Sequence, residues 1–210
     1  MTKSTFLLLK QWCLANTPLR GGYKVTIEEK LAIFIYIAST GASFRTIIEH
    51  FYRPIETIHK AFKAILHAMI LLYREVIQLP GPNRPLDKRI AGDPKYFPFF
   101  DNCINALNGT HIYTYLPVES TPPFRNRKGF LSQNVLAAYT FDLQFSFVYP
   151  GWEGNAHDTR VLNDAEQKGR FVVPARKFYL ADAGYTNRWP YLSPYRGTRY
   201  HLREQAIAQM

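Results

Sequence analysis

Few side chains in this 210-residue sequence have the types and spacing that chemistry requires. His157 and Asp158 stand together at the start of a predicted helix, where an acid/base pair could form, although such a pair more often caps and packs the helix. Asp182 ends an apolar segment, where its carboxylate could cap the following turn. The two cysteines, Cys13 and Cys103, have neither the CxxC pattern nor the histidine spacing of a structural zinc site. The residues alone therefore indicate no zinc centre.

Basic side chains outnumber acidic ones. Lys and Arg number 26 and Asp and Glu number 16, which gives a formal net charge of +10. This surplus favours a polyanionic partner by long-range attraction, and nucleic acid is such a partner. Lys60 and Lys63 lie off the apolar stripe of a predicted helix, and a predicted loop carries Arg125, Arg127 and Lys128. Both sets could contact DNA phosphates, but a solvated charged surface has the same composition.

The amino-terminal part is predicted to form the helices that carry Lys60 and Lys63. Acidic residues open an apolar segment at 28–39, a second short segment covers 43–51, and Pro54 suits the first turn of a third. In the third, apolar residues recur at steps of three and four, the pattern of one helix face: Ile55, Ile58, Phe62, Ile65, Met69, Leu72 and Val76. A short turn before this helix gives a helix-turn-helix arrangement, although any small helical bundle fits the same pattern.

The second half of the sequence changes character. Residues 80–98 are rich in proline and glycine, cannot continue a helix, and are predicted to be a linker. Beyond it, β-branched and aromatic residues at 134–141 and 145–150 predict two strands with a hairpin-like gap between them. Residues 155–169 favour a helix and residues 177–180 another strand. The predicted order is strand, strand, strand, helix, strand.

Six sequence blocks occur in a fixed order in this second half. They are NALNGTHI at 105–112, RNRKG at 125–129, SQNVLAAYTFDLQF at 132–145, GWEGNAHDTRVL at 151–162, YLADAGY at 179–185 and PYRGTRYHL at 194–202. Together they resemble the DDE superfamily endonucleases of Harbinger transposases. The helical part, with VTIEEKLAIFIYIAS and FRTIIEHFYRPIETIHKAF, is similar to the region that precedes this domain in fungal members.

The resemblance implies a fold and a chemistry. The fold is α/β, with a helix-turn-helix-like region at 1–79, a linker at 80–98, and a partial endonuclease domain with an incomplete RNase H-like mixed sheet at 99–210. Three acidic residues of such a domain converge on two divalent cations, Mg²⁺ or Mn²⁺, which activate the nucleophile and stabilise the leaving oxygen. DNA is the implied substrate, a transposase-type protein partner is also implied, and the nucleus is the expected location. No apolar run is long enough for a membrane helix.

The sequence departs from the family pattern at its acidic positions. Asn108 stands immediately before the glycine of GTHI, where the family has its first acid, whereas Asp182 in YLADAGY matches the second. An amide offers one neutral carbonyl oxygen and cannot bridge two cations, so metal affinity should fall. Asp101 lies too far upstream to substitute, because seven residues of extended chain span about 23 Å.

The third acid, a glutamate on a later helix, is expected to be absent, because Glu204 follows the PYRGTRYHL block too closely to be that residue. The last strand of the sheet is expected to be absent as well, so the domain is predicted to be truncated. Three hypotheses follow. The chain is a degenerate transposase-derived protein that still binds DNA, an incomplete gene model of an active nuclease, or a protein-interaction remnant that docks through an exposed sheet edge.

Overall fold

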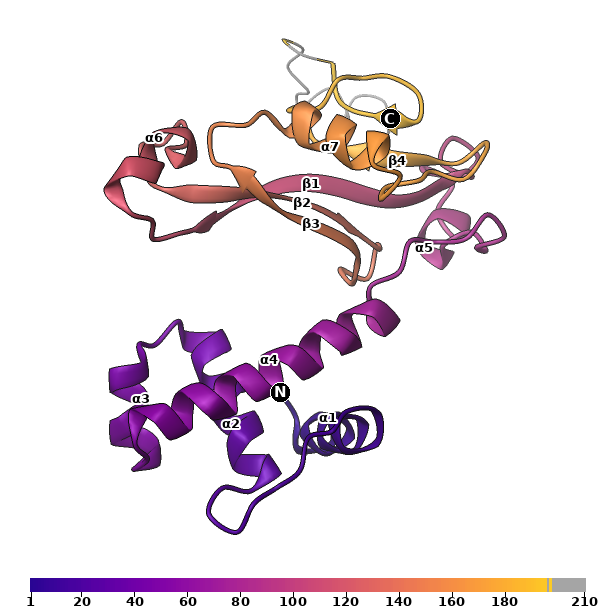
Figure 1. The fold of residues 1–210 in the computed structure, drawn as a ribbon. Coiled ribbons are helices and arrows are strands. Elements are labelled where there is room, and N and C mark those ends of the chain that lie inside the picture. Colours follow the sequence, from indigo (N-terminus) through magenta and orange to yellow (C-terminus); the bar gives the residue numbers. More distant parts are fainter. Residues whose placement is uncertain (196, 198–210) are drawn as a thin grey trace, which may run out of the picture. The chain divides into compact units, whose positions relative to one another are not determined.

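The computed structural model describes residues 1–195 and 197, and the chain divides into two compact units at Val76 and Ile77 (Figure 1). The first unit consists of helices and the second contains a mixed sheet. This arrangement confirms the predicted α/β class. None of the helices within the described residues is long and apolar enough to cross a membrane.

The first unit contains four helices within residues 1–76. They are α1 (Lys3–Asn16), α2 (Ile27–Thr40), α3 (Phe44–Phe51) and α4 (Ile55–Val76). The last three are the helices that the sequence predicts. Helix α1 was not predicted, because its apolar residues do not keep to one face: Leu7 and Leu8 are exposed while Cys13 is fully buried.

Local signals set the ends of the helices in the first unit. The Thr26 hydroxyl accepts a hydrogen bond from the Glu29 backbone N–H at 3.2 Å and so caps the start of α2. Gly41 ends this helix in the left-handed conformation, with φ 66°. Helices α2, α3 and α4 then pack on one another through a shared buried cluster of Ile33, Ile47, Ile58 and Ala61.

The second unit is built around a five-stranded sheet with the order β3-β2-β1-β4-β5. The antiparallel part comprises β1 (Cys103–Tyr113), β2 (Ser132–Tyr139) and β3 (Phe145–Glu153). On the other side of β1, the parallel strands are β4 (Phe178–Ala181) and β5 (Tyr191–Leu192). Strand β1 is therefore central, with an antiparallel neighbour on one side and a parallel neighbour on the other.

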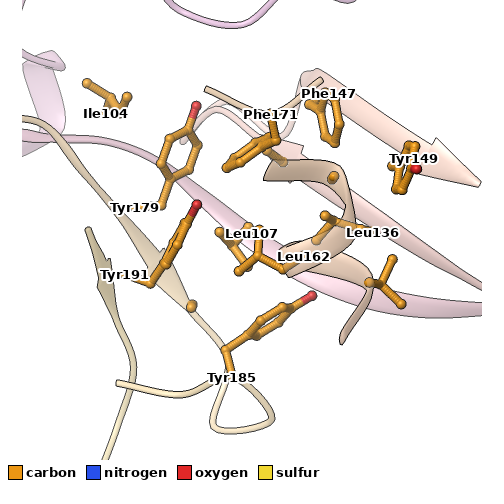
Figure 2. Close-up of a cluster of buried hydrophobic side chains, with 14 of the residues drawn as sticks. Ile104, Leu107, Leu136, Phe147, Tyr149, Leu162, Phe171, Tyr179, Tyr185 and Tyr191 are labelled. Carbon is orange, nitrogen blue, oxygen red and sulfur yellow. The ribbon is translucent and has the colours of Figure 1, made fainter. Parts of the chain in front are cut away.

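Helix α7 (Asp158–Gln167) lies across one face of this sheet (Figure 1). Its buried residues Val161, Leu162 and Ala165 join the strands in the main core. Figure 2 shows Phe171 between Phe147 and Tyr179, with ring centroids 4.8 and 5.1 Å away. Asp158, at the start of α7, lies against Gly109 of β1 and Gly184 beyond β4.

Two segments of the second unit differ from the expectation. The sequence predicted no strand after Asp182, yet β5 pairs with β4 there through Tyr191 and Leu192. A strand of two residues has no alternation that a sequence pattern could reveal. The proline-rich segment 80–98 belongs to the second unit and contains the short helix α5 (Lys88–Ala91), with Ile90 buried.

Short helical turns also occupy the connection from β1 to β2, namely η1 (Val118–Ser120) and α6 (Thr121–Phe124). Glu204, together with most of the PYRGTRYHL block, lies outside the described residues.

Candidate functional site

The site begins where the pairing of β1 with β4 ends. Leu107 pairs with Ala181 in parallel register, and both face the main core. Successive side chains of a strand point to opposite faces, so the next residues, Asn108 and Asp182, turn away from that core. Both are exposed. The two positions that the family resemblance assigned to the first and second acids therefore lie side by side on neighbouring chain segments.

Asp158, the first residue of α7, lies against the backbone of the same two segments. A side chain added at Gly109, directly after Asn108, would overlap the Asp158 carboxylate. A side chain added at Gly184 would meet Asp158 Oδ2 at 2.9 Å and Asp182 Oδ2 at 3.8 Å. The distance between Asp158 Oδ2 and Asp182 Oδ2 is therefore no greater than these two distances added together. Glycine at 109 and 184 is thus what allows the start of α7 to approach the strand ends.

Asn134 on β2 holds Asp158 in this place. Its side-chain amide donates to Asp158 Oδ1 at 2.8 Å and to the Ala156 carbonyl at 3.0 Å. Only 1% of Asn134 is exposed, and its own Oδ1 has no hydrogen-bond partner among the described residues. A buried amide that donates to a carboxylate fixes the orientation of that carboxylate.

Tyr185, in the turn that follows β4, is buried in the main core. Burial raises the pKa of Tyr185, and the negative charges of Asp158 and Asp182 raise it further. The phenol therefore stays protonated near these carboxylates. Its hydroxyl is buried without a hydrogen-bond partner in the described part of the chain.

The RNRKG loop at 125–129 forms the opposite wall. Asn126 is buried, and its side-chain oxygen accepts from the backbone N–H of Lys128 at 2.9 Å while its amide donates to Ser132 Oγ at 3.0 Å. Arg125 donates to the Gly129 carbonyl at 2.7 Å and closes the loop. This folding of the loop around Asn126 leaves Arg127 and Lys128 exposed.

Arg127 joins the loop to the start of α7. Its guanidinium lies 2.6 Å from His157 Nδ1, within hydrogen-bonding distance. His157 occupies the N-cap position of α7 but makes no side-chain capping bond. The sequence favoured capping for this histidine; the structure instead places it against Arg127.

A cavity of ≈ 630 Å³ lies between these walls. The side chains of Arg127, Lys128, His111 and His157 line it, and the Asp158 carboxylate contributes the negative charge. His111 is held by Ser132, whose Oγ lies 3.1 Å from His111 Nδ1. Two cationic side chains and the N-terminal end of α7 favour an anion here, and a phosphate group has suitable charge and acceptor oxygens.

The described residues do not fit a two-cation centre. Within residues 1–195 and 197, no three His, Cys, Asp or Glu side chains converge in a way that could hold a metal ion. Asp182 offers one carboxylate and Asn108 a neutral amide oxygen. The Asp158 carboxylate is nearby, but one of its oxygens already accepts a hydrogen bond from Asn134.

The other predicted DNA-binding residues belong to the first unit. Lys60 and Lys63 are exposed on α4, opposite the buried stripe of Ile58, Ala61 and Ile65. Arg125 differs from its neighbours Arg127 and Lys128, because its guanidinium is used within its own loop and does not line the cavity.

Sequence reasoning missed several residues of the site. It favoured capping and packing over an acid/base role for His157 and Asp158, and it did not single out Asn134 or His111. The available signal was the glycine directly after Asn108 and the glycine two residues after Asp182, since each marks a place where another chain segment approaches the backbone closely.

Comparison with known families gives two matches. Residues 1–71 match a domain family of unknown function, DUF8040, and residues 107–209 match the DDE superfamily endonucleases. No curated protein and no solved structure matches the chain. The second match begins at Leu107 and so contains Asn108, Asp158, Asp182 and the cavity between them. The chain therefore carries a DDE superfamily endonuclease domain over residues 107–209, preceded by a DUF8040 domain.

Proposed function

We propose that this chain is a Harbinger-type, transposase-derived protein that binds DNA in the nucleus and whose ability to cleave DNA is impaired. The observation that carries the proposal is the pair Asn108 and Asp182, which directly follow Leu107 and Ala181, the last residues through which β1 pairs with β4. By family resemblance these are the positions of two carboxylates, and here one of them is an amide.

The chemical consequence of that amide is large. DDE superfamily endonucleases generally use divalent metals, and Mg²⁺ and Mn²⁺ prefer carboxylate oxygens. Replacing a carboxylate by an amide removes one negative charge and one of two acceptor oxygens. Asp182 alone cannot offset the charge of two cations, so the remaining residues would hold them weakly.

The DNA-binding part of the proposal rests on charge. The net charge of +10 favours a polyanion, and Arg127 and Lys128 line a cavity that suits a phosphate. Phosphate contacts of Arg127 and Lys128 do not depend on Asn108, because the two side chains belong to the 125–129 loop and Asn108 lies on β1. Binding of DNA can therefore persist in a chain that has lost cleavage.

Calorimetric titration with Mn²⁺ tests the metal part of the proposal. The unaltered chain should bind Mn²⁺ weakly or not at all, and Asn108→Asp should bind it at least about tenfold more tightly, because a second carboxylate is restored. Adding Asp182→Ala to Asn108→Asp should abolish that gain. Asn83→Asp, a matched change at an exposed position before β1, should leave the affinity unchanged.

One result would contradict this proposal directly. If the unaltered chain binds Mn²⁺ tightly and Asp182→Ala abolishes the binding, a working centre survives without a carboxylate at position 108. Cleavage of supercoiled plasmid DNA in Mn²⁺ by the unaltered chain, lost in Asp182→Ala, would lead to the same conclusion.

A protein-interaction remnant is the second candidate, and one surface favours it. Apolar side chains at and beyond the end of β1 are strongly exposed: Ile112, Tyr113, Tyr115 and Val118. Exposed apolar patches of this kind are typical of protein-binding surfaces. DNA binding remains the leading proposal, because the cavity and the net charge both point to an anion.

A further inference from the structure

The loop that connects α1 to α2 lies along the side of α4. Tyr23 and Lys24 at its tip line a groove of ≈ 570 Å³ together with Thr57, Lys60 and Ala64 of α4. Tyr23 is fully exposed, and Lys24 is exposed beside it. The loop and the helix therefore present an aromatic ring and two lysines to one continuous surface.

Hydrogen bonds within the first unit hold this loop in place. The Arg20 guanidinium donates to the carbonyls of Thr17 and Leu19 at 3.0 and 2.7 Å, and Lys30 Nζ donates to the Arg20 carbonyl at 2.8 Å. The Gly22 N–H donates to the Val25 carbonyl at 2.9 Å and tightens the tip. Arg20 and Lys30 are thus used to anchor the loop, which leaves Lys24 as its outward cation.

The nearby acidic side chains do not neutralise the surface. Glu28 pairs with Lys10, and Glu29 accepts two hydrogen bonds from Arg53, at 2.7 and 3.1 Å. Within residues 1–195 and 197, Lys24 and Lys60 form no ion pair, and Lys63 forms none either. The acid closest in sequence on the exposed side of α4 is Glu56, in the first turn of the helix.

The short connection between α3 and α4 gives a reason for a cationic loop to lie beside α4. Helices α3 and α4 are joined by the three residues Tyr52–Pro54, with Tyr52 in the left-handed conformation at φ 51°. A connection of this length is compatible with a helix-turn-helix motif, in which the later helix enters the DNA major groove. Lys60 and Lys63 lie on the exposed face of α4, and the loop borders that face along Thr57 and Lys60.

We propose that the 20–25 loop is a DNA-backbone clamp, in which Lys24 and Tyr23 contact phosphates beside the DNA major groove that α4 enters. This inference rests on the DNA binding proposed above and assigns the contact to the first unit. A phosphate backbone suits the surface because an ammonium and a phenol both donate to phosphate oxygens. Duplex DNA also carries regularly spaced phosphate charges. Lys24 and Lys60 can contact these phosphates at the same time, because both line the same groove of the protein.

Fluorescence anisotropy with a labelled duplex, at several salt concentrations, tests the clamp in the full chain. Lys24→Ala should weaken binding of any duplex sequence, and the slope of log affinity against log salt should become shallower by about 0.9 for each lost phosphate contact. Tyr23→Phe should weaken binding less than Tyr23→Ala, because it removes the hydroxyl and keeps the ring. Lys3→Ala is the matched control and should bind like the unaltered chain.

The other arm of the experiment separates the clamp from the cavity of the second unit. The double variant Arg127→Ala/Lys128→Ala should lose the phosphate contacts of the 125–129 loop. Adding Lys24→Ala to it should weaken duplex binding further. If Lys24→Ala and Tyr23→Ala bind like the unaltered chain while Arg127→Ala/Lys128→Ala binds weakly, the clamp is wrong and the proposed function stands. A chain that binds no duplex at all overturns both.

Discussion

Asp158 occupies the space that a side chain at position 109 would need. Gly109→Ala should therefore lower the free energy of unfolding by about 1 to 3 kcal/mol, the usual cost of forcing extra volume into a packed region. Urea denaturation followed by circular dichroism measures this change. The cause is steric, because the added methyl group would overlap the Asp158 carboxylate.

Two further variants isolate that cause. Gly81→Ala should leave the stability nearly unchanged, because nothing lies within 4 Å of the added atom. In the background of Asp158→Ala, the cost of Gly109→Ala should shrink, since the overlapping carboxylate is gone. Equal costs in both backgrounds would show that Asp158 does not occupy this space.

At the residue scale, sequence reasoning placed Asp182 at the end of an apolar strand, and β4 indeed ends at Ala181, directly before it. It could not place Asp158. Motif order along the chain shows which blocks are present, and it does not show which blocks touch. The contact of Asp158 with Gly109 depends on how α7 crosses the sheet. That crossing is set by the packing of Phe171 and Leu162 in the main core.

At the scale of elements, the cap of α2 can be tested directly. Thr26→Ala should lower the free energy of unfolding by about 1 kcal/mol, because the Glu29 N–H loses its acceptor. Thr26→Ser keeps a hydroxyl at the cap and should recover most of the loss. Urea denaturation of all three chains gives the comparison, and an alanine variant as stable as the original would mean that the cap contributes nothing.

Which elements the sequence predicted depended on their pattern. Helices α2 and α3 have N-terminal caps at Thr26 and Ser43, α4 has a regular apolar stripe, and all three were predicted. Helix α1 has an apolar run that is half exposed, so it lacks a stripe, and β5 has only two residues. Both are stabilised by their neighbours, α1 by packing on α2 and α4 and β5 by pairing with β4.

For the whole molecule, buried groups predict a loss of stability in alkali. Burial raises the pKa of the Cys103 thiol from its ordinary value of 9.0 to about 12, and burial also raises the pKa of Tyr179 and Tyr191. Because the folded pKa is the higher one, the unfolded chain loses these protons first. Stability from these groups is complete below pH 9.0 and declines as the pH rises toward 12.

Urea midpoints measured at increasing alkaline pH should show this decline. Tyr179→Phe should make it shallower, because the variant removes a buried phenol whose hydroxyl has no hydrogen-bond partner within the described residues. Tyr115→Phe, at a residue that is 99% exposed, should leave the curve unchanged. Midpoints that stay constant to high pH would contradict the assignment of these groups as buried and protonated.

The amide of Asn108 has one more consequence, because the residue after it is glycine. In an asparagine–glycine pair, the backbone nitrogen of the glycine can attack the side-chain carbonyl, ammonia leaves, and water opens the resulting succinimide to aspartate or isoaspartate. Gly109 pairs with Leu136 in the sheet, and because this pairing restrains the backbone, the reaction is expected to be slower than in an open loop. As a preparation ages, some chains will regain by spontaneous deamidation the carboxylate that the gene does not encode.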